Sequence, residues 1–222
     1  MLSIIRTIRK FGRPIANKIR FWRRKKYISQ LKEMFPPEVS IISSNCFAGR
    51  ILQDLGREYN TPTLGLYFWA PDYIEFLKNI NYYLTEAKIQ FVEKSKYELG
   101  NERRLSWSHW YPIGLLDGKV EIHFLHYHSE EEAAEKWYRR ASRTNLNNLF
   151  IIGMDQNQST KNEIIEFEKL PYQNKIYFSR FPLNTSSNEY MPEFHNKESV
   201  GDAYKKAHLY YKHLINHFKI NK

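Results

Sequence analysis

The single cysteine of the chain, Cys46, lies where a predicted strand passes into a predicted helix. Residues 39–42 form a short β-branched apolar run of the kind found in buried strands. The apolar residues of 51–55 then share one face of a helix that should end at Gly56. Unpaired N–H groups and the partial positive charge at a helix N-terminus favour a thiolate over a thiol. Cys46 is therefore a candidate nucleophile with a lowered pKa, and a buried structural cysteine is the alternative.

A cluster of three histidines contains the candidate base for this thiol. His123, His126 and His128 fall at the end of a predicted hairpin arm, where the apolar alternation places His126 on the inward face. A neutral imidazole there could accept the Cys46 proton, so we expect the two side chains within hydrogen-bonding reach or one water apart. Asp155 ends the next buried strand and is the candidate to orient that imidazole. The alternatives are a core histidine and an aspartate that only caps a turn.

Four further residues are candidates for substrate binding: Asn45, His123, Arg139 and Arg140. The two arginines follow a predicted capping box at residues 129–132 and could bind phosphate, although a solvated helix face is the alternative. The histidines could also be metal ligands, but their spacing matches no established zinc pattern. The sequence contains no glycine-rich phosphate loop and no dinucleotide fingerprint. We therefore predict neither a metal nor a cofactor.

The positive charge is concentrated at the N-terminus. Residues 1–27 carry ten Lys and Arg and no acid, and these ten equal the net charge of +10. The other 24 of the 34 basic residues balance the 24 acidic residues. Because the rest of the chain is neutral, we do not expect it to bind nucleic acid.

The basic segment also has the apolar spacing of an amphipathic helix, with apolar residues every three or four positions: Ile4, Ile8, Phe11, Ile15, Ile19 and Trp22. Such a helix can lie in the interface of an anionic membrane, and Gly12 and Pro14 are expected to kink it. A solvated basic tail or a helix packed on the body is the alternative. The chain has no apolar run of membrane-spanning length. We predict a basic amphipathic segment over residues 1–35, a single globular domain over residues 36–222, and a cytoplasmic protein held peripherally on the inner face of the cell membrane through residues 1–27.

The remaining pattern predicts strands that alternate with helices around one hairpin. This order favours an α/β fold with a mixed sheet and flanking helices, and a papain-like α+β arrangement is the alternative. Residues 93–104 and 182–200 are expected to be loops. The predicted strands cover residues 63–69, 89–92, 113–116, 120–125, 149–154 and 176–181, and the predicted helices cover 71–84, 129–141, 163–170 and 204–218.

Several short motifs occur together in the chain: Ser44-Asn45-Cys46-Phe47-Ala48-Gly49, Pro62-Thr63-Leu64-Gly65-Leu66, Pro71-Asp72-Tyr73-Ile74, Trp110-Tyr111-Pro112-Ile113-Gly114, His123-Phe124-Leu125-His126-Tyr127, Glu131-Glu132-Ala133 and Lys136-Trp137-Tyr138-Arg139-Arg140. Over about residues 38–218 they resemble the bacterial family catalogued as domain of unknown function nineteen-nineteen. Its members are commonly labelled exopolysaccharide biosynthesis proteins. The resemblance implies a role in cell-surface polysaccharide assembly, with a sugar or lipid-linked glycan intermediate as the partner. A fainter similarity to papain-like cysteine proteins makes Cys46 and His126 the matching pair and identifies no third residue.

These observations together predict a transferase that moves an acyl or glycosyl group to a sugar intermediate. The thiol route would use Cys46 and His126, with the backbone N–H groups after Cys46 as an oxyanion site. One alternative is a metal-independent glycosyltransferase in which Cys46 is structural. The other is a non-catalytic module that binds a glycan or a partner at the membrane. Replacing Cys46 by Ala distinguishes the thiol route from both alternatives.

Overall fold

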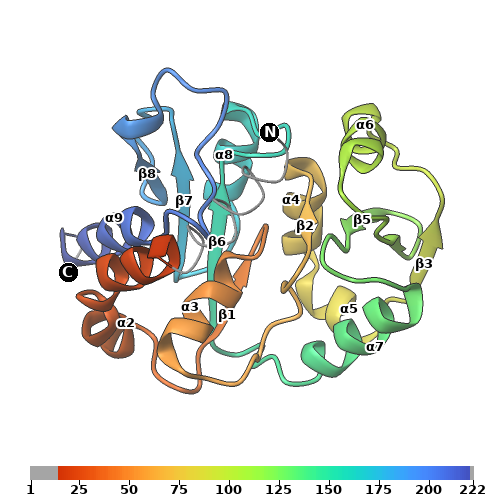
Figure 1. The fold of residues 1–222 in the computed structure, drawn as a ribbon, viewed down its shortest axis with the longest axis horizontal. Helices are drawn as coiled ribbons and strands as arrows, with labels where there is room; N and C mark the ends of the chain where they lie inside the picture. The colour runs from red at the N-terminus through yellow and green to blue at the C-terminus, as the bar shows by residue number, and fades with distance from the viewer. Residues whose placement is uncertain (1–14, 221–222) are drawn as a thin grey trace.

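The structure is a computed structural model that describes residues 15–220. Within these residues the strands form two four-stranded sheets (Figure 1). Sheet A is parallel, in the order β1 (Ser40–Ser43), β6 (Leu149–Met154), β7 (Lys175–Ser179) and β8 (Asn188–Tyr190). Sheet B is antiparallel, in the order β2 (Tyr67–Phe68), β5 (Val120–His123), β4 (Ile113–Leu116) and β3 (Ile89–Val92). The predicted α/β class is confirmed, with the parallel and antiparallel strands separated into two sheets.

Strand β6 lies inside sheet A, and its side chains alternate between two hydrophobic clusters. Phe150 and Ile152 belong to one cluster and Ile151 to the other. Gly153 leaves space that the Tyr177 ring of the neighbouring strand fills. A Cβ added at Gly153 would lie 2.1 Å from that ring. Both faces of sheet A are therefore buried, as is typical of a parallel sheet.

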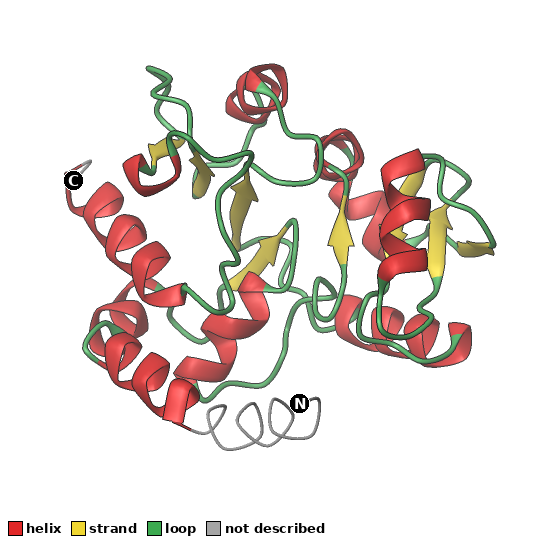
Figure 2. Cartoon of the chain, turned by 45° about the horizontal axis from the view of Figure 1, so that its top comes forward, coloured by secondary structure: helices red, strands yellow, loops and turns green. Residues whose placement is uncertain are grey.

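Helices cover both faces of sheet A. One cluster contains side chains of α2 (Ile28–Met34), α3 (Phe47–Leu55) and α9 (Ala207–Ile220), which lie together in Figures 1 and 2. The other cluster joins sheet A to sheet B, so that the two sheets share a core. The helices that contribute to this shared core are α4 (Ala70–Lys78), α5 (Ile80–Thr85), α7 (Glu130–Ala141) and α8 (Lys161–Glu168).

Four predicted elements differ from those observed. The helix predicted over 71–84 is divided at Asn79, and the strand predicted over 63–69 is reduced to β2, because Gly65 has a positive φ of 69° that interrupts extended backbone. Residues predicted as loops contain α6 (Glu98–Ser106), β8 and the short 3₁₀ helix η1 (Pro192–Phe194).

The basic segment is helical over residues 15–25. Arg24 is buried and its Nε atom lies 2.7 Å from Asp54 on α3, so one side of this helix is fixed to the body. Ile15, Ile19 and Trp22 are exposed, and they lie about 140–200° around the helix from Arg24. The predicted kink at residues 12–14, and all of residues 1–14, lie outside the described residues. Within residues 15–220, no helix is long and apolar enough to cross a membrane.

Candidate functional site

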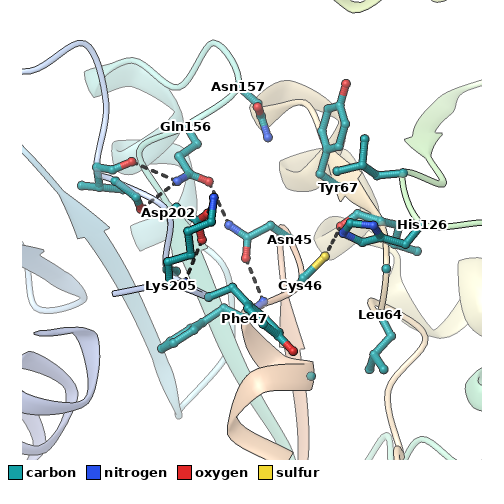
Figure 3. A pocket seen from close by; sticks show the side chains of 18 of the residues that line it. Asn45, Cys46, Phe47, Leu64, Tyr67, His126, Gln156, Asn157, Asp202 and Lys205 are labelled. Carbon is teal, nitrogen blue, oxygen red and sulfur yellow. Dashed lines mark hydrogen bonds and ion pairs between the residues drawn. The ribbon is translucent and has the colours of Figure 1, made fainter. Parts of the chain in front are cut away.

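A cavity of about 910 Å³ lies at the carboxyl ends of β1 and β6 (Figure 3). The connections that leave these two neighbouring parallel strands go to opposite faces of sheet A, since α3 belongs to one hydrophobic cluster and α8 to the other. Such a topological switch point is where open α/β sheets bind their ligands. The walls come from chain segments far apart in sequence: 45–53, 64–67, 103–107, 125–126, 156–157 and 199–205.

Two carboxamides connect the walls of this cavity. The Asn45 side chain donates to Gln156 Oε1 at 2.9 Å. Gln156 in turn donates to the backbone oxygens of Val200 and Gly201, at 2.9 and 3.1 Å. In Figure 3, Gln156 lies across the cavity from His126. The ends of β1 and β6 and the loop before α9 are therefore held in fixed positions.

The turn after β6 has an unusual backbone. Asn157 and Gln158 have positive φ angles of 52° and 63°, and they are two of the three non-glycine residues with positive φ among residues 15–220. Such angles are disfavoured for residues with a side chain and collect at functional sites. The turn brings Asn157 Oδ1 to within 2.8 Å of Arg103 Nη1. Asn157 also donates to the Phe68 carbonyl at 3.1 Å, so this turn connects sheet A to β2 of sheet B.

Cys46 lines the cavity at the start of α3, as the sequence predicted. Its thiol is partly buried and donates to the Leu66 carbonyl at 3.5 Å. Burial raises the pKa of Cys46 to about 11. The predicted lowering of this pKa is therefore wrong, because loss of hydration outweighs the effect of the helix terminus.

The backbone N–H groups after Cys46 are already paired. The Phe47 N–H donates to Asn45 Oδ1 at 3.0 Å, and the Ala48 N–H donates to Ser43 Oγ at 3.0 Å. These side chains cap α3, as expected for Asn and Ser beside a helix start. The two N–H groups are consequently not free to act as the predicted oxyanion site.

The structure brings Cys46 and His126 to the same cavity, as predicted, but it does not place Asp155 beside them. His126 also lines the cavity, but its side chain is exposed and forms no hydrogen bond with the described Cys46 side chain. The cavity wall removes part of the hydration of the His126 ring, and this partial desolvation, together with the nearby His109, lowers the pKa of His126. Asp155 is only 1% exposed and faces Arg180, with its Oδ2 atom 3.3 Å from Arg180 Nε, so it does not orient His126. Burial raises the pKa of Asp155.

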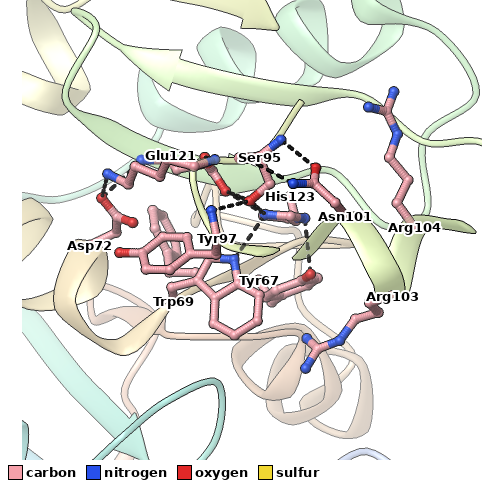
Figure 4. A network of polar contacts seen from close by, with 12 residues as sticks. Tyr67, Trp69, Asp72, Ser95, Tyr97, Asn101, Arg103, Arg104, Glu121 and His123 are labelled. Carbon is pink, nitrogen blue, oxygen red and sulfur yellow. Dashed lines mark hydrogen bonds and ion pairs between the residues drawn. The ribbon is translucent and has the colours of Figure 1, made fainter. Parts of the chain in front are cut away.

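His123 lies in a buried polar network instead of at the surface (Figure 4). It is 0% exposed; its Nε2 atom lies 2.7 Å from Glu121 Oε1 and 2.9 Å from Trp69 Nε1, and its Nδ1 atom lies 2.9 Å from the Tyr67 hydroxyl. A ring nitrogen carries either one N–H or one lone pair, so Nε2 either donates to the Glu121 carboxylate or accepts the Trp69 N–H, and not both at once. Burial lowers the pKa of His123. The predicted direct contact of His123 with substrate is wrong, because the side chain does not reach the cavity surface.

The strand ends earlier than the sequence predicted, and this explains the positions of the three histidines. β5 stops at His123, and the Leu125 N–H then bonds to the His123 carbonyl at 3.0 Å, which breaks the alternation before His126. His128 is exposed. Among residues 15–220, no group of three His, Cys, Asp or Glu side chains is arranged to hold a metal ion.

The two predicted arginines lie on α7 outside the cavity lining. Arg139 is exposed, with its Nε atom 3.3 Å from Glu135, and Arg140 donates to the Tyr127 hydroxyl. Of the four predicted substrate-binding residues, the structure brings only Asn45 to the cavity.

Several residues of the cavity were not predicted from the sequence. Gln156 and Asn157 directly follow the buried strand that leads into Asp155, and this position is the signal that could have identified them. Arg103 and Trp107 lie in or beside α6, which has too weak an apolar pattern to be distinguished from a loop. The lining residues of 199–205 lie in a polar segment without a recognisable motif.

The cavity and its surrounding network lie within a single known domain. The family model described as "Domain of unknown function (DUF1919)" matches residues 16–222, so the chain belongs to this family. The chain is also similar to an uncharacterised protein of Haemophilus influenzae, with 38% identity over 167 residues, which are 75% of this chain and 74% of that protein.

Proposed function

We propose that the cavity at the carboxyl ends of β1 and β6 binds the sugar of a glycan intermediate, and that the protein transfers a glycosyl or acyl group to it in cell-surface polysaccharide assembly. The observation that supports this proposal is the cavity at the switch point, where carboxamides and aromatic side chains face a common space. The family resemblance noted in the sequence agrees with a role in polysaccharide assembly.

The cavity lining suits a sugar ring. Sugar hydroxyls exchange hydrogen bonds with carboxamides, whose oxygens each keep a second lone pair after pairing within the protein. Asn45, Gln156 and Asn157 supply three such groups. The C–H faces of a sugar pack on aromatic rings, and Trp107 and Tyr204 line the cavity while 38% and 42% exposed.

The environment of Cys46 favours transfer without a covalent thiol intermediate. A thiol with a pKa of about 11 is almost entirely protonated at neutral pH, and the protonated form is a poor nucleophile. The N–H groups that would stabilise an oxyanion already donate to the side chains that cap α3. We therefore favour glycosyl transfer with Cys46 as part of the wall, and acyl transfer through Cys46 is the second candidate.

Complementation of a strain that lacks the gene tests this proposal. We expect the strain to lose surface polysaccharide and to accumulate a lipid-linked sugar intermediate, measured by mass spectrometry. The unaltered gene and Cys46→Ala should restore the polysaccharide, whereas Trp107→Ala should not. Trp110→Ala is the matched control, because Trp110 is also exposed, at 49%, but does not line the cavity. Unchanged polysaccharide in the deletion strain would refute the function, and failure of Cys46→Ala alone would restore the thiol route.

We further propose that the N-terminal helix holds the protein on an anionic membrane surface at the inner face of the cell membrane. Its exposed apolar side chains at 15, 19 and 22 face away from Asp54, and exposed Lys and Arg flank them. Each basic residue near an anionic surface contributes about 1 kcal/mol, and apolar burial adds to this.

Flotation with vesicles of phosphatidylcholine and phosphatidylglycerol tests the membrane proposal. We expect binding that weakens with salt and is largely lost when Ile15, Ile19 and Trp22 are all changed to Ser. Ile165→Ser on α8 is the control, since Ile165 is similarly exposed, at 42%, on another part of the molecule. Equal binding of the triple variant and the control would show that this face does not insert.

A further inference from the structure

We infer that Arg103 is the anchor for a phosphoryl group, so that the ligand of the cavity is a phosphorylated sugar. This inference rests on the proposed function for the sugar part of the ligand. It concerns a residue on α6 that lines the cavity and whose role no sequence pattern indicated.

The charge of Arg103 is not neutralised within the described chain. Its guanidinium donates to an amide oxygen, that of Asn157, at 2.8 Å, and no carboxylate of residues 15–220 forms a salt bridge with it. Other cationic side chains near the same cavity are paired. Arg24 and Arg50 both face Asp54, and the lining residue Lys205 lies 2.9 Å from Asp202. Arg103 is thus a cation at the cavity wall that lacks an anionic partner.

Arg103 is also held in place before any ligand arrives. Its guanidinium carbon lies 4.9 Å from the ring centre of Tyr67 and 4.9 Å from that of Trp69. These two rings are in turn fixed by His123, which bonds to the Tyr67 hydroxyl and the Trp69 N–H at 2.9 Å each. A guanidinium fixed by aromatic faces loses little freedom on binding, which is the condition for a strong anion contact.

The geometry of this cation suits phosphate. A guanidinium has five N–H donors in a planar fork that matches phosphate oxygens in pairs, and Asn157 occupies only one nitrogen. The cavity volume of about 910 Å³ is near the upper end of the range of roughly 300–1,000 Å³ for small-molecule sites. A sugar ring together with a phosphoryl group can therefore be accommodated. A sugar carboxylate is the competing anion, and glucuronate represents it in the titration.

Titration with inorganic phosphate, glucose 1-phosphate and glucuronate, followed by NMR on the full chain, tests the inference. Inorganic phosphate needs no knowledge of the sugar, and we expect it to bind with a Kd on the order of 1 mM. Arg103→Gln should weaken phosphate binding at least about tenfold, and Arg103→Lys should restore only part of it because lysine lacks the fork. Arg104→Gln is the matched control: Arg104 is the next residue of α6, points away from Arg103 in Figure 4 and does not line the cavity.

The outcomes separate this inference from the proposed function. Phosphate binding that is absent, or that Arg103→Gln and Arg104→Gln weaken equally, would overturn the phosphoryl anchor. Glucuronate binding more tightly than phosphate, with the same dependence on Arg103, would also overturn it in favour of a carboxylated sugar. Arg103-dependent phosphate binding in a protein whose deletion leaves polysaccharide unchanged would refute the proposed function while the anchor stands. Folding of each variant is checked by its amide spectrum.

Discussion

Replacing the buried His123 by Leu should destabilise the protein strongly. The imidazole is 0% exposed and has three close polar partners: Glu121, Tyr67 and Trp69. Leucine has no polar atom, so the Tyr67 hydroxyl loses its partner at Nδ1, and Glu121 and Trp69 lose the one hydrogen bond that Nε2 offers them. The Glu121 carboxylate is the most affected because it is also 0% exposed.

The expected loss follows from these contacts. Leaving a buried donor or acceptor without its partner costs about 1–3 kcal/mol, and more when that group is charged, as the Glu121 carboxylate is. Glu121 keeps hydrogen bonds from the Ser95 hydroxyl and the Lys96 N–H, and these reduce the destabilisation that comes from this carboxylate. We therefore expect His123→Leu to lower the free energy of unfolding by about 4 kcal/mol, measured by urea denaturation at pH 7. This is a large part of the roughly 5–15 kcal/mol that stabilises a typical domain.

The pH dependence gives this prediction a second test. Burial alone would raise the pKa of Glu121, but its hydrogen bonds with His123 and Ser95 hold that pKa below the ordinary value. A carboxyl with a lowered pKa contributes stability above its unfolded pKa of about 4.3, and this contribution is lost as the pH falls through the folded value. The cost of His123→Leu should therefore be greatest at neutral pH and smaller below about pH 4.

His126→Leu is the matched control, because this histidine lies three residues away and is exposed. It should change the free energy of unfolding by no more than about 0.5 kcal/mol. A cost of His123→Leu below about 1 kcal/mol, or equal costs for the two variants, would refute the view that His123 organises this network.

Three further predictions concern the core, the C-terminal helix and the thiol. Gly153→Ala should lower the free energy of unfolding by about 1–3 kcal/mol, because its Cβ would lie 2.1 Å from the Tyr177 ring; urea denaturation that shows no loss would contradict this packing. Burial alone would lower the pKa of His213, but hydrogen bonds to glutamates raise it. The contribution of His213 to the free energy of unfolding should therefore be complete below about pH 6.5 and disappear as the pH rises through this raised pKa. Glu189→Gln removes the carboxylate that lies 2.6 Å from His213, so stability should then depend less on pH above about 6.5. An unchanged pH dependence would mean that other groups cause it. The native Cys46 thiol should react slowly with iodoacetamide at pH 7 and faster up to about pH 11, whereas a rate that levels off by about pH 8.5 would show an ordinary thiol.

The local elements of the fold could largely be predicted from periodicity. The helix that begins after Cys46 ends at Gly56, which has a φ of 66°, as its position after the last apolar residue indicated. The hairpin turn at Asp117 and Gly118 was identifiable because both residues tolerate the positive φ angles of 45° and 69° found there. The start of α7 was also identifiable, since Ser129 Oγ accepts the Glu132 N–H at 3.1 Å. In each case the cause is local, so a few neighbouring residues suffice.

The candidate site could be predicted only in part, because its contacts join distant segments. The position of Cys46 and Asn45 at the end of β1 was correct, and this followed from the β-branched run before them and the helical spacing after them. The sequence could not show that burial raises the pKa of Cys46, since that depends on walls contributed by other parts of the chain. The prediction that His126 points inward was wrong because β5 stops at His123. The apolar pattern up to His123 is the same whether the strand stops there or continues, so the sequence did not show this end.

The cavity walls come from segments spread between Asn45 and Lys205, and a ligand that fills the cavity would connect all of them at once. A molecule bound in this way acts as a reversible cross-link, because unfolding must release it before the segments can separate. At a concentration of 100 times its Kd, such a ligand adds about 2.7 kcal/mol to the free energy of unfolding. For a chain of this size that corresponds to a rise of roughly 5–10 °C in Tm. A library of sugar phosphates can therefore be ranked by melting temperature alone, before any reaction is known.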